Sequence, residues 1–382
     1  MHQEKRTQKG QADYLPALTW LRGLSALLVV VSHSIRCSES LQEVGFPIES
    51  STLLSFLDLG AFAVCVFFTL SGATLYLSSA NSSRPFTTSS YLLKRWLRIW
   101  PAFILALIVY GLFGAYFRFS VPAALPTQFT HQFTTPVSVI DTIKYVTMTF
   151  NITGPGGLFN NAFWTIPVEF TYYLMLPFLL FAMRYIGVAA PILLACVMFL
   201  ISRTTLASLM HDPRTLMLGF TFCGGVVLGS LKTILHRHLS SFVAYTALAI
   251  TLLLAIAITQ APDALLQETF IPQKYISLGI LSVVIVGISL FSELHLPDYA
   301  ARKLSFLGKT SYSIYLFHNL FLGVFTLIVL RVGVTSAIPI AYLAFVFTLT
   351  CTLPAAYLSY SFVEEPAILT GRRLAVRLAK PA

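Results

Sequence analysis

Two of the eight histidines, His33 and His318, lie within long apolar stretches of the sequence. A charged side chain inside a bilayer costs about 2.5–3.5 kcal/mol on insertion scales, so ionisable residues in such stretches indicate function. Arg22 precedes His33 by eleven residues, which is close to three α-helical turns. The two side chains therefore share one helix face about 16 Å apart, pairing an anion-binding group with a titratable base. The alternative is that Arg22 reaches the lipid headgroups and His33 is an ordinary buried histidine.

Glu169 is a carboxylate inside the fourth long apolar stretch, five residues after Trp164. We expect it at about the depth of His33, where a carboxylate would orient and charge the imidazole. Tyr172 and Tyr173 follow at helical spacing and share the face of Glu169. The alternative for Glu169 is a structural hydrogen bond between helices.

Arg95 and Arg98 are spaced i, i+3 at the start of the third apolar stretch. Two guanidinium groups on one helix face suit a phosphate-bearing ligand, because each can bind two oxygens. The neighbouring Trp96 and Trp100 could stack on a flat ring or belong to the aromatic belt of the membrane interface. A basic interface without a ligand is the alternative.

A polar stripe runs along the ninth apolar stretch, where Ser311, Tyr315 and His318 are spaced i, i+4, i+7. We expect this stripe to face other helices rather than lipid. Hydrogen-bonded packing explains it as well as catalysis does. For Glu364 and Glu365, at the end of the last stretch, a structural role is favoured over a chemical one.

Composition predicts the scaffold that holds these residues. Only 10% of the 382 residues are charged and 56% are hydrophobic, and the mean hydropathy is +0.77. These values favour an all-α, polytopic membrane helix bundle over a soluble domain. The net charge of +10 does not indicate nucleic-acid binding, because the basic residues lie at the ends of apolar stretches. The five cysteines have no paired spacing, so neither a disulfide framework nor a metal site is predicted.

About ten stretches have the length of a membrane-spanning helix. A ten-helix topology with both termini in the cytoplasm puts 17 of the 25 lysines and arginines on the cytoplasmic side, as the positive-inside rule requires. The predicted spans cover approximately residues 16–35, 56–77, 99–119, 163–183, 188–204, 215–231, 242–259, 273–291, 310–331 and 338–362.

The chain reads as a single domain over residues 1–382. Residues 1–14 are expected to form a cytoplasmic N-terminal tail, and residues 367–382 a basic cytoplasmic tail. The longest loop, residues 120–162, is expected on the outer side. It contains several aromatic residues and few charges, so we expect it to fold against the helices.

Six short patterns along the chain resemble those of the acyltransferase-3 family, membrane proteins of about ten helices that acylate sugars of cell-envelope glycans. Each pattern alone is weak, but all six occur in the family's order and on predicted helices. Five positions depart from the family's usual residues, namely Ser32, Ala63, Ala73 and the adjacent Thr165 and Ile166. None of these departures removes a titratable group, so they bear on substrate preference more than on activity. The six patterns are Arg22-x10-His33, Phe67-Phe68-Thr69-Leu70-Ser71-Gly72, Arg95-x-x-Arg98, Trp164 to Glu169 with Pro177, Ser311-Tyr312-x-x-Tyr315-Leu316-x-His318, and Glu364-x-Pro366.

The resemblance implies an acyltransferase that uses acyl-CoA, most often acetyl-CoA, as a donor substrate and has no permanently bound cofactor. Arg95 and Arg98, with Arg22, would bind the donor phosphates from the cytoplasm. His33, oriented by Glu169, would act on a hydroxyl of a cell-envelope polysaccharide or lipid-linked sugar, either as general base or as a transient acyl acceptor. The implied location is the bacterial inner membrane, and a homo-oligomer is left open.

Two other classes of function stay open at this point. A proton-coupled secondary transporter would use His33, Glu169 and His318 as a proton relay, although the sequence has no visible inverted repeat. A scaffold for envelope synthesis would tolerate charge-neutral substitutions at all of these positions.

Overall fold

The computed structural model describes residues 15–46, 52–81, 86–120, 127–235, 238–261, 273–333 and 340–378. It is 85% helical and has no β-strand in these ranges, which confirms the predicted all-α membrane bundle. The N-terminal tail predicted for residues 1–14 lies outside the described residues.

Eight helical segments in the described ranges are long and apolar enough to cross a membrane. Two further apolar helices, α9 and α13, are shorter and coincide with the predicted spans 188–204 and 273–291. The helices of 14 residues or more are α1 (Pro16–Glu43), α3 (Gly60–Ala80), α4 (Thr88–Ser120), α8 (Thr165–Ile186), α9 (Ala189–Ser202), α11 (Gly219–Ile234), α12 (Ser241–Gln260), α13 (Gln273–Leu290), α14 (Asp298–Val332), α15 (Ile340–Ser359) and α16 (Glu365–Leu378). A π-helical turn, Tyr360–Glu364, lies between the last two. The short ones are α2 (Thr52–Ser55), α5 (Gln128–Thr134), α6 (Val139–Val146), α7 (Phe150–Thr153) and α10 (Arg214–Met217), with 3-10 turns at Asn161–Trp164 and Thr205–Leu209.

Several helices are longer than the apolar stretches that predicted them. Helix α4 begins at Thr88, although the apolar stretch begins near residue 99, and α14 begins at Asp298 instead of near residue 310. Hydropathy measures the part of a helix that lipid covers, whereas backbone hydrogen bonds continue into polar sequence. Arg95 therefore lies within a continuous helix and not at its entry.

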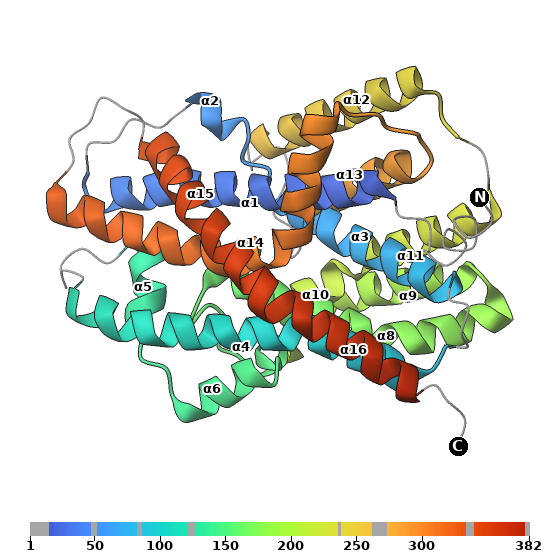
Figure 1. Ribbon diagram of the computed structural model, residues 1–382, viewed down its shortest axis with the longest axis horizontal. Coiled ribbons are helices and arrows are strands. Elements are labelled where there is room, and N and C mark those ends of the chain that lie inside the picture. Colours follow the sequence, from blue (N-terminus) through green and yellow to red (C-terminus); the bar gives the residue numbers. More distant parts are fainter. Residues whose placement is uncertain are drawn as a thin grey trace, which may run out of the picture.

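Helices α1 and α14 form the central pair and run parallel, side by side in Figure 1. Trp20 donates a hydrogen bond to Ser305 near the start of the pair, and Cys37 contacts Thr326 further along. Their backbones touch where glycines replace side chains. A Cβ atom at Gly308 would lie 2.1 Å from the carbonyl oxygen of Thr19. This close approach aligns the polar residues of α1 with those of α14.

Helices α3 and α11 cross equally closely. A Cβ atom at Gly72 would lie 2.1 Å from the carbonyl oxygen of Phe222, and one at Gly225 would lie 2.0 Å from that of Thr69. Small residues let helices approach closely in a membrane, where packing replaces the hydrophobic effect as the driving force. The glycine of the Leu-Ser-Gly pattern in α3 thus serves helix packing.

The long loop predicted at 120–162 packs against the bundle over its described residues, 127–162. It contains the short helices α5, α6 and α7, and Phe133, Tyr145, Phe150 and Phe159 are buried in the main hydrophobic core. Burial raises the pKa of the Tyr145 phenol, so it stays neutral and accepts a hydrogen bond from the Leu158 amide at 2.9 Å.

The last helices form one long diagonal in Figure 1, in which α15 continues through the π-helical turn into α16. The segment predicted as a basic tail from residue 367 is therefore helical as far as Leu378. Helix α16 packs on the start of α4, where Ser90 donates a hydrogen bond to the carbonyl oxygen of Ala375 at 3.0 Å. The start of α1 and the end of α16 lie toward the same end of the bundle.

Candidate active site

His33 lies on α1 at the contact with α14. Its Nδ1 atom is 2.7 Å from Oδ1 of Asn319 and 3.2 Å from Nε2 of His318. Both of these partners are fully buried, whereas His33 itself is partly exposed. Ser311, Tyr315 and His318 are all buried, so the predicted polar stripe on α14 faces the other helices.

His33 lines a cavity of about 600 Å³, which we call the histidine cavity. This volume falls in the range of sites that hold small molecules, about 300–1,000 Å³. The lining is rich in polar groups. It comprises His33, Arg36, Gln128, Phe129, Phe150, Asn151, Gly156, Gly157, Asn161, Trp164, His211, Asp212, Pro213, Arg214 and Asn319.

Trp164 lines the histidine cavity, and a half-buried ion pair lies against its ring. The Arg214 guanidinium lies 3.6 Å from the centre of the Trp164 ring. Asp212 binds this guanidinium with both carboxylate oxygens, at 2.8 Å and 2.7 Å. The arrangement combines a cation–π contact with a bidentate ion pair, and together they hold the indole ring in the lining of the cavity.

A second, narrower cavity of about 60 Å³ lies further along the bundle, and we call it the arginine cavity. Most of its polar lining belongs to the predicted site residues or to their immediate neighbours. The lining comprises Arg22, Val64, Phe67, Phe68, Ser71, Arg98, Ile99, Thr165, Ile166, Glu169, Tyr173, Ser311, Tyr312 and Tyr315. Arg22 and His33 thus point from one helix into two cavities.

Three arginines gather at this end without ion-pair partners. Among the described residues, the two ion pairs are Lys144–Asp141 and Arg214–Asp212, so Arg22, Arg95 and Arg98 form none. Arg22 and Arg98 line the arginine cavity, while Arg95 lies against the rings of Tyr91 and Tyr173. The Nε atom of Arg95 is buried and has no hydrogen-bond partner in the described part of the chain. Such a cluster favours an anionic ligand.

The predicted pair of His33 and Glu169 does not form. Glu169 lines the arginine cavity and accepts hydrogen bonds from Ser71, at 2.9 Å, and from Tyr173. His33 lines the other cavity and has Asn319 and His318 as partners. The prediction rested on similar depth in the membrane, but similar depth does not decide which helix faces which.

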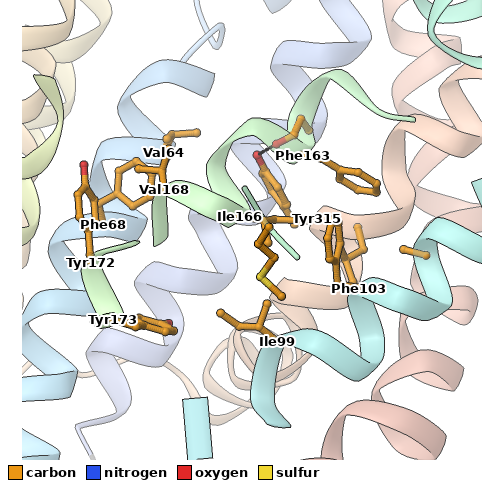
Figure 2. Close-up of a cluster of buried hydrophobic side chains, with 14 of the residues drawn as sticks. Val64, Phe68, Ile99, Phe103, Phe163, Ile166, Val168, Tyr172, Tyr173 and Tyr315 are labelled. Carbon is orange, nitrogen blue, oxygen red and sulfur yellow. Dashed lines mark hydrogen bonds between the residues drawn. The ribbon is translucent and has the colours of Figure 1, made fainter. Parts of the chain in front are cut away.

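Tyr172 also departs from its predicted place beside Glu169. Its hydroxyl donates a hydrogen bond to the carbonyl oxygen of Thr215 at 2.7 Å, and its ring packs against Phe68 and Phe222. Figure 2 shows Tyr172 next to Phe68, with Tyr173 away from both. The i+3 and i+4 positions diverge by about 100° around the helix axis, and here the i+4 residue, Tyr173, contacts the carboxylate.

Tyr315 lies between the two cavities. It lines the arginine cavity, and its ring centre is 5.7 Å from that of His318, which in turn is 4.9 Å from that of His33. Its hydroxyl accepts a hydrogen bond from Thr165 at 2.7 Å and donates one to the carbonyl oxygen of Ala162. Figure 2 shows this residue beside Phe163 and Ile166. The series Tyr315–His318–His33 links the cavities.

Sequence reasoning missed several residues of the site. Asn319, Asn160 and Arg214 were not singled out, because a lone amide or a loop arginine carries no pattern. Glu364 was assigned a structural role, and the structure buries it with a hydrogen bond from Ser313 at 2.9 Å. It also interacts electrostatically with Arg98. Its position in a π-helical turn is a signal of function that only the backbone reveals.

One protein family is similar to this chain over most of its length. No curated protein and no solved structure matches the chain. The acyltransferase-3 family, described as an acyltransferase domain, matches residues 15–357. This match includes both cavities and five of the six sequence patterns, whereas the sixth, Glu364-x-Pro366, lies beyond the matched residues. Because it covers nearly the whole chain, the protein belongs to the acyltransferase-3 family.

Proposed function

We propose that this protein is a membrane-bound O-acyltransferase that moves an acyl group, in the first instance acetyl, from acyl-CoA to a hydroxyl. The acceptor would be a cell-envelope polysaccharide or a lipid-linked sugar, and the enzyme would lie in a bacterial inner membrane. Membership of the acyltransferase-3 family and the apolar helices support a membrane acyltransferase in general. The identities of the acyl donor and of the acceptor are what we propose beyond this family membership.

One observation carries the proposal. A single helix, α1, supplies Arg22 to the arginine cavity and His33 to the histidine cavity, and Tyr315 and His318 lie between the two. An anion site and a base that open to separate cavities suit a reaction whose two substrates enter from opposite sides. A thioester and an alcohol would then meet near His33.

The donor side is assigned by charge. Arg22 and Arg98, with Arg95 beside them, would bind the phosphates of acyl-CoA, because guanidinium groups bind phosphate oxygens bidentately. The arginine cavity is narrower than an acyl-pantetheine arm requires, so donor binding would have to part its lining side chains. Glu169, held by Ser71 and Tyr173, lies in the lining of the same cavity as Arg22 and Arg98 and would help to position them.

The acceptor side is assigned by shape and polarity. The histidine cavity is large enough for a sugar, and the Trp164 ring is part of its lining. His33 would remove the proton of a sugar hydroxyl while the oxygen attacks the thioester carbonyl carbon. The new ester bond forms as the carbon–sulfur bond breaks, and the proton passes from His33 to the departing thiolate. The products are the acylated sugar and coenzyme A.

Isotope transfer tests the proposal. Membranes that contain the protein, supplied with acetyl-CoA labelled in the acetyl group, should form an ester on envelope glycan that mild alkali releases. A proton-coupled transporter would leave no label on glycan. His33→Gln should abolish transfer because it removes the base while keeping a polar side chain of similar size.

A control variant separates loss of chemistry from loss of folding. His295→Gln changes a histidine outside both cavities, so it should transfer label at the rate of the unchanged protein. The two variants should insert into membranes in equal amounts. If His33→Gln retains full transfer, His33 is not the base and the proposed chemistry is wrong.

A further inference from the structure

We propose that Asn160 and Asn319 form an amide relay that holds His33 in the tautomer a general base requires, with the proton on Nδ1 and a lone pair on Nε2. This inference rests on the proposed role of His33 and adds two positioning residues to it. Neither amide belongs to the sequence patterns that indicated the site.

The orientation of Asn160 follows from a backbone group. Its Oδ1 atom lies 2.8 Å from the backbone nitrogen of Ala162, and an N–H group can only donate. Its Nδ2 atom donates to the hydroxyl of Tyr110 at 2.9 Å, while that hydroxyl donates to the carbonyl oxygen of Leu316 at 3.1 Å. The amide of Asn160 therefore cannot be reversed without losing these bonds.

The orientation of Asn319 follows from that of Asn160. The distance from Asn319 to Oδ1 of Asn160 is 2.7 Å, so the atom of Asn319 at this contact must be the Nδ2 donor. Its Oδ1 atom then faces His33, at 2.7 Å from Nδ1. An amide oxygen only accepts, so Nδ1 of His33 must carry a proton.

His318 provides a second, independent argument. Its Nδ1 atom faces the carbonyl oxygens of Tyr315 and Ile314, at 2.9 Å and 3.2 Å, and must therefore be protonated. In the neutral ring Nε2 is then an acceptor, and it lies 3.2 Å from Nδ1 of His33. Two acceptors thus meet Nδ1 of His33, and the shorter contact is that to Asn319.

The remaining nitrogen of His33 is left for chemistry. Nε2 of His33 makes no hydrogen bond within the described part of the chain, and the Nδ1 edge is covered by two fully buried side chains. His33 lines the histidine cavity, and Nε2 is its ring nitrogen without a hydrogen-bond partner in the described residues. A neutral imidazole with its lone pair toward the acceptor is the form that can remove a hydroxyl proton. When His33 takes up that proton, Nδ1 keeps both acceptors.

Nitrogen NMR of the full chain in lipid bilayers tests the relay without depending on activity. Protein labelled with ¹⁵N-histidine, measured at alkaline pH and compared with His33→Gln to identify the signals, should show His33 protonated at Nδ1 and unprotonated at Nε2. A neutral His33 protonated at Nε2 would overturn the proposal.

Variants then connect the tautomer to catalysis. Asn319→Leu removes the closer acceptor and should populate the Nε2-protonated form, lowering kcat about tenfold, because general-base catalysis contributes about 10²–10⁴-fold. The donor KM should not change. Asn319→Asp keeps an acceptor toward Nδ1 of His33 but loses the donor to Oδ1 of Asn160, so it should keep the Nδ1-protonated tautomer and recover part of kcat. Asn160→Ala should act in the same direction as Asn319→Leu.

Thr326→Val is the matched control for packing. It removes another buried contact between α1 and α14, the one to Cys37 at 3.2 Å, two turns beyond Asn319. Its tautomer and kcat should equal those of the unchanged protein. If Asn319→Leu lowers kcat without changing the tautomer, the residue is merely structural and the relay is refuted. If His33→Gln keeps full transfer, the base assignment fails, whereas the NMR result still decides the tautomer.

Discussion

The close contact between α11 and α3 at Gly225 predicts that adding one methyl group there lowers the stability of the protein. In Gly225→Ala the new Cβ atom on α11 would lie 2.0 Å from the carbonyl oxygen of Thr69 and 2.9 Å from the nitrogen of Ala73, both on α3. Backbone atoms cannot turn aside as a side chain does. Because non-bonded heavy atoms approach to about 3.5 Å, the two helices must separate by about 1 Å or more.

The magnitude follows from two opposing terms. Overpacking of this kind costs about 1–3 kcal/mol, and a contact with backbone puts Gly225→Ala at the upper end. Replacing glycine by alanine inside a helix returns about 0.5–1 kcal/mol of backbone entropy. The net expectation is a loss of about 2 kcal/mol in the free energy of unfolding. Gly111 on α4 has no atom within 4 Å of its Cβ position. Gly111→Ala should therefore gain the backbone-entropy contribution without any overpacking.

The assay is thermal unfolding of the purified proteins in detergent micelles, followed by tryptophan fluorescence. The apparent midpoint should fall for Gly225→Ala, by about 1 °C for each kcal/mol lost in a chain of this length. It should rise slightly for Gly111→Ala. Equal midpoints for the two variants would show that α3 and α11 do not touch through this glycine.

Three further predictions concern the two cavities. Arg98→Ala should raise the KM for acyl-CoA at least tenfold and leave the acceptor KM unchanged, as steady-state kinetics with each substrate varied would show; an equal rise in both would refute the assignment. Arg214→Ala should raise the acceptor KM but not the donor KM, because Trp164 loses the cation that holds its ring; an unaltered acceptor KM contradicts this. Tyr173→Phe removes a hydrogen bond to Glu169 and should lower kcat. Tyr172→Phe should leave kcat unchanged and lower the thermal midpoint, because it loses a hydrogen bond worth about 1 kcal/mol. If Tyr172→Phe lowered kcat and Tyr173→Phe did not, the assignment of Tyr173 to the cavity would be wrong.

The helical pattern of the chain was predictable because membrane insertion is a local property. About twenty apolar residues suffice to cross a bilayer whatever the rest of the chain does. The predicted spans accordingly fall on the helices of the structure, and the errors are at their polar ends, as in α4 and α14. Those ends are stabilised by backbone hydrogen bonds and neighbouring helices, which hydropathy does not measure.

Relations within one helix were also predictable. Arg22 and His33 share a face, and Ser311, Tyr315 and His318 form a buried stripe, because the helix repeat of 3.6 residues fixes both. The contact between the stripe and His33 was not predictable in this way. It depends on the register of α1 against α14, which the close approach at Gly308 determines.

By itself, the sequence determined an all-helical membrane bundle, the acyltransferase-3 family and most of the polar residues that line the cavities. Only the tertiary structure determined which side chains contact each other. In the structure Glu169 pairs with Ser71 and Tyr173, and His33 pairs with Asn319. Arg214, at the start of the short helix α10, packs on Trp164. The physical reason is that composition and periodicity specify the depth and the face of a residue, whereas partners are chosen by helix rotation and register. These are set by backbone contacts between segments far apart in the sequence.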